Sequence, residues 1–108
     1  MNCESLTKIN ISKLKTDSVV TMENMFSGCK ELQSIDLSNL NTDNVSNMKG
    51  IFSGCQKLLE INISQLNTDY VEDTSLMFNG CSSLIAVNVS NLINVKNIWR
   101  ECFMNVLL

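Results

Sequence analysis

The stretch MFSGCKELQSIDLSNLNTDNVSNMKGIFSGCQKL, residues 25–58, holds one complete 26-residue unit and the start of the next. Apolar columns recur at this period through the chain, and a cysteine leads each unit, at Cys3, Cys29, Cys55 and Cys81. The spacing gives a single repeat domain, 1–108, with coils 3–28, 29–54 and 55–80 and an irregular terminal coil 81–108. A fixed period of about 20 to 50 residues is typical of a solenoid.

The first half of each unit has the period of a strand. In residues 34–38, Ile35 and Leu37 alternate with polar side chains, which predicts a short strand with one solvated face. Stacked coils would place equivalent strands side by side in a parallel sheet.

The second half of each unit has the period of a helix. Apolar side chains recur at steps of three and four residues at Val45, Met48, Ile51 and Phe52. Thr42 and Asp43 offer N-terminal capping, and Gly54 stands where a left-handed C-terminal residue is expected. The sequence therefore predicts an α/β repeat solenoid of about four coils, with one short parallel strand plus one short helix per 26-residue coil.

The composition excludes several classes of function. The chain is 44% hydrophobic and 18% charged, and its net charge of −3 gives no basic surface for nucleic acid. It has no His, and Arg100 is its single Arg, which removes imidazole bases, His-ligated metals and Arg clusters. We therefore expect no enzyme activity, no cofactor and no nucleic-acid partner. We also find no export signal in residues 1–20 and no apolar run of the ~20 residues that a membrane span needs.

The cysteine column allows two interpretations. We favour free buried thiols, because Cys29, Cys55 and Cys81 each follow a glycine and precede a leucine by three positions, as a small buried hydrophobe would. The alternative is a redox or metal site. Stacking would bring neighbouring thiols within the Cα separation of about 4.4 to 6.8 Å that a disulfide needs, although no C-x-x-C pair begins a zinc site.

A second column consists of Asp17, Asp43 and Asp69, each preceded by Thr. We assign these carboxylates to the first turn of each expected helix, where the helix dipole favours a negative charge by about 0.3 to 1 kcal/mol. The alternative is a row of carboxylates that binds a hard cation such as calcium.

The outward side of the expected strands is the candidate binding face. It is a strip of small polar side chains without Tyr, Trp or Arg, so we expect weak contacts from this chain alone. Its alternative role is that of a solvated sheet face. The candidate residues are Asn10, Ser12, Ser34, Asp36, Ser38, Glu60, Asn62, Ser64, Asn88 and Ser90.

The quoted stretch resembles the BspA-like leucine-rich repeat surface proteins, in particular the 26-residue repeat of mycoplasma lipoproteins. The resemblance rests on F-x-G-C, L-x-x-I-D-L-S and N-T-D-x-V-x-x-M in fixed order. It implies a variant leucine-rich-repeat-like solenoid. It also implies a non-enzymatic module of a bacterial surface or secreted protein, acting as a protein-binding or adhesion platform or as a spacer.

Partner and location follow from the same resemblance. The expected partner is a protein, either of a host or a second copy, and the expected location of the parent protein is the cell surface or the medium. The alternative is an intracellular, cytoplasmic protein-binding scaffold, which the missing export signal supports. End-to-end self-association is also expected, because nothing in the sequence covers Leu6, Ile9 and Ile11 from the N-terminal side.

Overall fold

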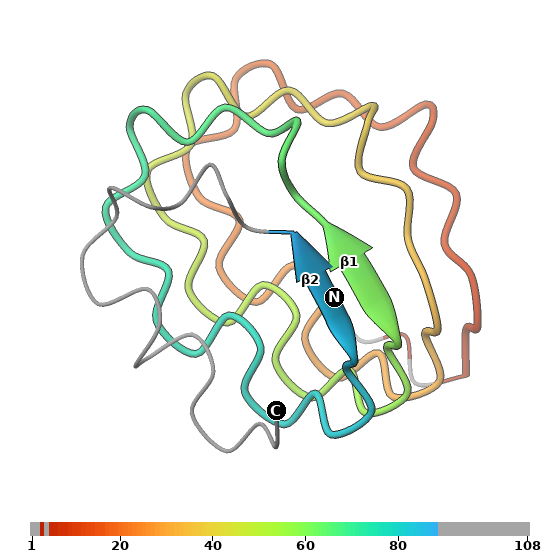
Figure 1. Cartoon of the computed structure of the whole chain (residues 1–108). Helices are drawn as coiled ribbons and strands as arrows, with labels where there is room; N and C mark the ends of the chain where they lie inside the picture. The colour runs from red at the N-terminus through yellow and green to blue at the C-terminus, as the bar shows by residue number, and fades with distance from the viewer. Residues whose placement is uncertain (1–2, 4, 89–108) are drawn as a thin grey trace.

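The computed structural model describes residue 3 and residues 5–88, which span the first three repeats and the beginning of the fourth. The chain winds through successive loops of similar outline that lie side by side (Figure 1). This part of the chain contains two strands, β1 (Glu60–Asn62) and β2 (Ala86–Asn88). They pair in parallel, with Glu60 opposite Ala86, which is the register that the columns predict.

The expected leucine-rich-repeat-like α/β solenoid, with one strand and one helix in every coil, is wrong. No helix occurs in the described residues, and the segments equivalent to β1 in the first two repeats, 8–10 and 34–36, are not strands. A helix needs each amide to bond the carbonyl four residues back. In the segment expected to be helical, Phe52 N instead donates to Met77 O at 3.0 Å, in the following repeat.

Tight turns replace the helix. Many amides donate to the carbonyl three residues back, and these bonds recur at equivalent positions of successive repeats. One set joins Val19 N to Thr16 O, Val45 N to Thr42 O and Val71 N to Thr68 O, at 3.0 to 3.1 Å. A succession of such turns brings a side chain inward at every third or fourth residue, so it reproduces the spacing of an amphipathic helix.

Alternate amides connect each repeat to the next along one side of the molecule. We call residues 22–28, 48–54 and 74–80 the phenylalanine side. In the second repeat, four amides donate across to the third repeat at 2.7 to 3.0 Å: Met48 to Asp73 O, Gly50 to Ser75 O, Phe52 to Met77 O and Gly54 to Asn79 O. The first repeat donates to the second in the same way, so this side forms a continuous hydrogen-bonded ladder.

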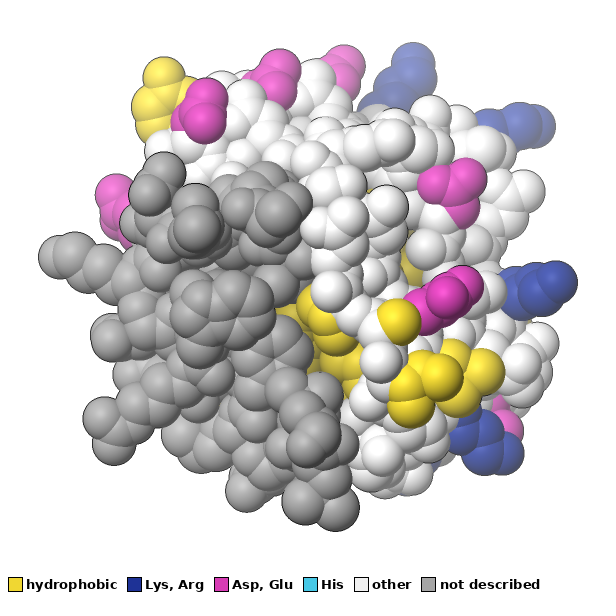
Figure 2. Space-filling view, in the orientation of Figure 1, with side chains coloured by type: hydrophobic (Ala, Val, Ile, Leu, Met, Phe, Trp, Pro, Cys, Tyr) yellow, Lys and Arg dark blue, Asp and Glu magenta, His cyan; other side chains and the backbone are white. Residues whose placement is uncertain are grey.

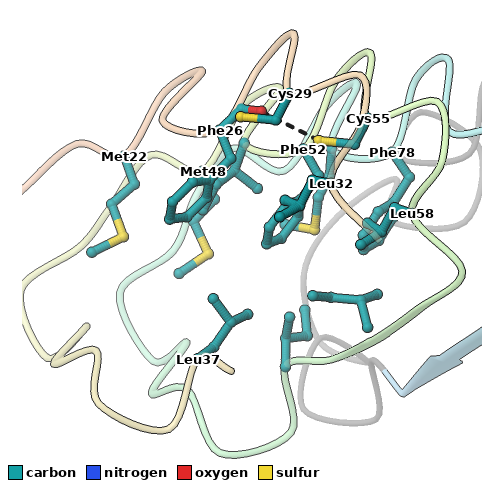
Figure 3. Packing of buried hydrophobic residues seen from close by; sticks show 14 of the residues in the cluster. Met22, Phe26, Cys29, Leu32, Leu37, Met48, Phe52, Cys55, Leu58 and Phe78 are labelled. Carbon is teal, nitrogen blue, oxygen red and sulfur yellow. Dashed lines mark hydrogen bonds between the residues drawn. The ribbon is translucent and has the colours of Figure 1, made fainter. Parts of the chain in front are cut away.

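The core consists of the apolar columns stacked repeat on repeat. Phe26, Phe52 and Phe78 are fully buried, and their rings stack at centroid distances of 5.6 and 5.9 Å (Figure 3). This separation lies in the range that favours offset stacking. The column weakens in the first repeat, where Leu6 and Leu14 are 49% and 38% exposed.

Candidate functional site

The threonines expected to cap helices connect adjacent repeats. Thr16 Oγ1 donates to Asn41 O and accepts from Asn41 N, both at 2.9 Å. Thr42 Oγ1 donates to Asn67 O at 2.8 Å. Both side chains are buried, so each hydroxyl satisfies backbone groups that would otherwise lose their bonds to water.

The aspartates next to these threonines were predicted to lie in the first turn of a helix, and this prediction is also wrong. Without a helix they have no helix dipole to complement. Asn41 Nδ2 donates to Asp17 Oδ1, and Asn67 Nδ2 donates to Asp43 Oδ1, both at 3.1 Å. Within residues 3 and 5–88, no three His, Cys, Asp or Glu side chains come together as metal ligands would. The Asn–Asp bonds therefore tie neighbouring repeats at the surface.

The candidate binding face lies on a different side, which we call the strand side: residues 8–12, 34–38, 60–64 and 86–88. Eight of the ten predicted residues are exposed, and Ser64 is half-buried. Ser90 lies outside the described residues. The structure thus brings the nine described members together on one surface across four repeats, in the register of β1 and β2.

Side chains on this face close local turns. Asn10 Oδ1 accepts from Ser12 N, and Asp36 Oδ1 accepts from Ser38 N, both at 2.9 Å. Backbone and side-chain hydrogen bonds from Ser38 hold the pKa of Asp36 below its usual value, so this exposed carboxylate is charged at neutral pH. Because N-x-S and D-x-S form such turns readily, the turns end the extended segments after only a few residues.

The strand side is hollowed between repeats. The hollow over β1 and β2 has a volume of about 430 Å³, and Ile35, Ile61 and Val87 contribute apolar lining beneath the polar residues Ser34, Glu60 and Asn62. A second hollow, of about 490 Å³, lies between Lys8–Ser12 and Asp36–Asn39. An apolar floor with polar groups at its margin is the usual composition of a binding groove.

An exposed apolar pair borders the hollow over β1 and β2, and sequence reasoning missed it. Leu59 and Ile85 are 44% and 82% exposed, and Ile85 N donates to Leu59 O at 2.9 Å. Both line a smaller depression with Gln33, Ser34 and Glu60. Hydrophobic side chains gather near the starts of β1 and β2 in Figure 2. The signal was a column that changes from polar to apolar along the chain: Thr7, Gln33, Leu59 and Ile85.

The cysteine column contains one disulfide and two free thiols, so each of the two predicted alternatives holds for part of the column. Cys3 and Cys29 form a disulfide with their Cα atoms 4.7 Å apart, so the expectation of free thiols is wrong for this pair. Cys55 and Cys81 are free and buried, as expected. Burial raises the pKa of the Cys55 thiol to about 11 and that of Cys81 to about 12, so both are protonated at neutral pH.

With this geometry established, a family comparison identifies the chain. The model of the family described as "Mycoplasma protein of unknown function, DUF285" matches residues 1–105. The chain belongs to this family. The DUF285 match spans all of the repeats described above. Searches of curated proteins and of solved structures gave no match.

Over the described part of this DUF285 chain, no helix is long and apolar enough to cross a bilayer.

Proposed function

We propose that this chain is a non-enzymatic module that binds an extended segment of a partner protein along the strand side. The supporting observation is the hollow over β1 and β2, with its apolar lining and the exposed Leu59–Ile85 pair at its border. An extended segment could place alternate side chains on this lining while its backbone faces the polar margin. The chemistry of the face thus favours a peptide with spaced apolar residues.

The parent protein is proposed to act at a bacterial cell surface or as a secreted protein, in adhesion or as a spacer. The support is the DUF285 assignment together with the resemblance of residues 25–58 to BspA-like surface proteins. Lys8, Asp36 and Glu60 carry charges of both signs on the face, so no strongly charged partner is implied.

Binding can be tested with an array of synthetic extended peptides and a panel of immobilised extracellular-matrix proteins. The Ile85→Glu variant should weaken any binding by about tenfold or more, because it places a charge at the apolar border of the groove. Val20→Glu is the matched control, since Val20 is also exposed but lies outside the strand side. It should change affinity by less than about twofold. Equal losses in both variants would refute the strand side as the site, and no binding by the unaltered chain would favour a spacer.

Location needs a separate experiment. Protease treatment of intact cells that express the full parent protein should remove the repeat region while a cytoplasmic marker survives. Protection equal to that of the marker would instead support the intracellular scaffold.

A further inference from the structure

The four leading cysteines lie in one column on successive repeats, and one neighbouring pair is already joined. Cys3 and Cys29 are separated by 26 residues and joined by a disulfide across adjacent repeats. Cys55 and Cys81 occupy the same position in the next two repeats and are both free. Pairing Cys3 with Cys29 leaves Cys55 and Cys81 as neighbours, whereas pairing Cys29 with Cys55 would separate the two remaining thiols.

The packing around the two free thiols repeats from one step of the column to the next. Cys55 Sγ donates to Phe26 O at 3.2 Å, and Cys81 Sγ donates to Phe52 O at 3.1 Å (Figure 3 shows the first of these bonds). Phe52 O also accepts from Cys55 N at 3.1 Å. The sulfur of Cys81 therefore lies beside the backbone of Cys55.

The spacing between adjacent repeats near Cys55 and Cys81 is suited to a disulfide bond. The rings of Phe52 and Phe78 are 5.9 Å apart, close to the 5.6 Å between Phe26 and Phe52. A Cβ added at Gly80 would lie 3.5 Å from Gly54 N, as one added at Gly54 would from Gly28 N. Successive repeats therefore stack at a similar spacing beside the cysteines, and the Cα atoms of Cys3 and Cys29 are 4.7 Å apart. Disulfides form at Cα separations of about 4.4 to 6.8 Å.

We propose that Cys55 and Cys81 are a second inter-repeat disulfide site, so that the column is closed in pairs under oxidising conditions. The co-reactant is a small disulfide such as oxidised glutathione. The Cys55 thiolate attacks one of its sulfurs and releases one thiolate of the co-reactant. The Cys81 thiolate then attacks the mixed disulfide and releases the second, so two electrons pass to the co-reactant and two protons to solvent. This proposal does not depend on the proposed binding function.

Reactivity should follow the burial of the pair. Both thiols are fully buried, so the oxidant reaches them only when the repeats open locally. Their raised pKa values keep the thiolate fraction small at neutral pH. The rate of bridge formation should therefore rise by up to about tenfold per pH unit, and it should also rise in mild denaturant.

The sequence allows the pairing to be assigned by tryptic mapping. Lysines separate the cysteines, so Cys3, Cys29, Cys55 and Cys81 fall in four different peptides: 1–8, 16–30, 50–57 and 58–96. A Cys102→Ser background removes the fifth thiol. The native chain is equilibrated with oxidised glutathione, alkylated in denaturant and digested without reduction. Two linked pairs are expected, 1–8 with 16–30 and 50–57 with 58–96.

Two results would overturn the proposal: alkylation of both Cys55 and Cys81 at equilibrium, or a link between peptides 16–30 and 50–57. In a Cys81→Ser control, Cys55 should be recovered as a free thiol or as its glutathione adduct, with the Cys3–Cys29 link intact. Oxidation should also raise the midpoint of thermal unfolding of the Cys102→Ser chain by about 5 °C or more, because the bridge closes a long loop. The control should show no such shift, and an equal shift in both would contradict the assignment.

Discussion

The phenylalanine side and the strand side are built from the same repeats but are held together differently. On the phenylalanine side, every second amide from Met22 to Gly28 and from Met48 to Gly54 donates to the next repeat. On the strand side, regular pairing is confined to β1 and β2, and hollows lie between the repeats. The continuous ladder holds the repeats together on one side, while the interrupted pairing leaves hollows on the other, where we propose that a partner binds.

The largest difference should appear when a side chain is truncated on each side. Phe52→Ala removes a fully buried ring that stacks on both Phe26 and Phe78, so it should lower the free energy of unfolding by about 3 to 5 kcal/mol. Ile35→Ala on the strand side should cost about 1 to 2 kcal/mol, because Ile35 is half-buried. Urea unfolding followed by circular dichroism measures both values. Equal losses would remove the distinction between the sides.

A second substitution separates the observed turns from the helix that the sequence predicts. Thr42→Asp would be a good N-cap at the start of a helix and nearly neutral. In this structure it places a carboxylate in a buried position that faces the carbonyl of Asn67, so we expect a loss of about 2 to 4 kcal/mol at neutral pH. Thr42→Ser keeps the hydroxyl and should cost much less. A neutral effect of Thr42→Asp in the same urea assay would support the helix.

Glycines on the phenylalanine side give a smaller, position-dependent effect. Gly50 has φ of 61°, and a Cβ there would collide with the side-chain oxygen of Asn24 in the preceding repeat. Gly50→Ala should therefore cost about 1 to 2 kcal/mol, because the positive φ strains an alanine and the end of the Asn24 side chain must also move. Gly54 also has positive φ, but its Cβ would make only ordinary contacts, so Gly54→Ala should cost about 1 kcal/mol. Thermal unfolding of the two variants tests this order, and the reverse order would contradict the stacking of Asn24 on Gly50.

These comparisons show which features the sequence could predict. The sequence predicted the register of β1 and β2, the buried Phe and Cys columns, and the left-handed conformation of Gly54. It did not distinguish turns from a helix, because both bring Val45, Met48, Ile51 and Phe52 inward. What distinguishes the two structures is the hydrogen-bond partner of each amide, and alternate amides of this segment donate to carbonyls one repeat away.

The candidate site was predictable to a similar degree. Strand alternation placed Asn10, Asp36 and Asn62 on an exposed face, and the structure agrees. The hollows were not predictable, because they depend on where the pairing between repeats stops. The Leu59–Ile85 pair could have been found by comparing each column for a change of residue type rather than for its constancy.

The smallest expected effect concerns acid stability at Asp73, which directly precedes the third segment of the phenylalanine side. A hydrogen bond from the Ser75 hydroxyl, aided by the Ser75 backbone amide and by the charge of Lys49, lowers the pKa of Asp73 below its usual value, although partial burial opposes this. A lowered folded-state pKa stabilises the fold above pH ~4, and that contribution is lost as the pH falls through the folded value. Asp73→Asn removes the titration but keeps the turn, since Asn47 makes the same turn by accepting from Lys49 N.

The wild type should therefore lose slightly more stability than Asp73→Asn between pH ~5 and ~3. Urea unfolding at a series of pH values measures this difference. Parallel pH profiles would show that Asp73 contributes nothing through its charge.

The central claim is that the repeats bond to one another through the segment where the sequence predicts a helix. Scalar couplings across hydrogen bonds, measured by NMR on isotope-labelled protein, test it most directly. The structure predicts a coupling from the amide nitrogen of Phe52 to the carbonyl carbon of Met77, in the next repeat. A coupling from Phe52 to the carbonyl of Met48, four residues back in the same repeat, would contradict it.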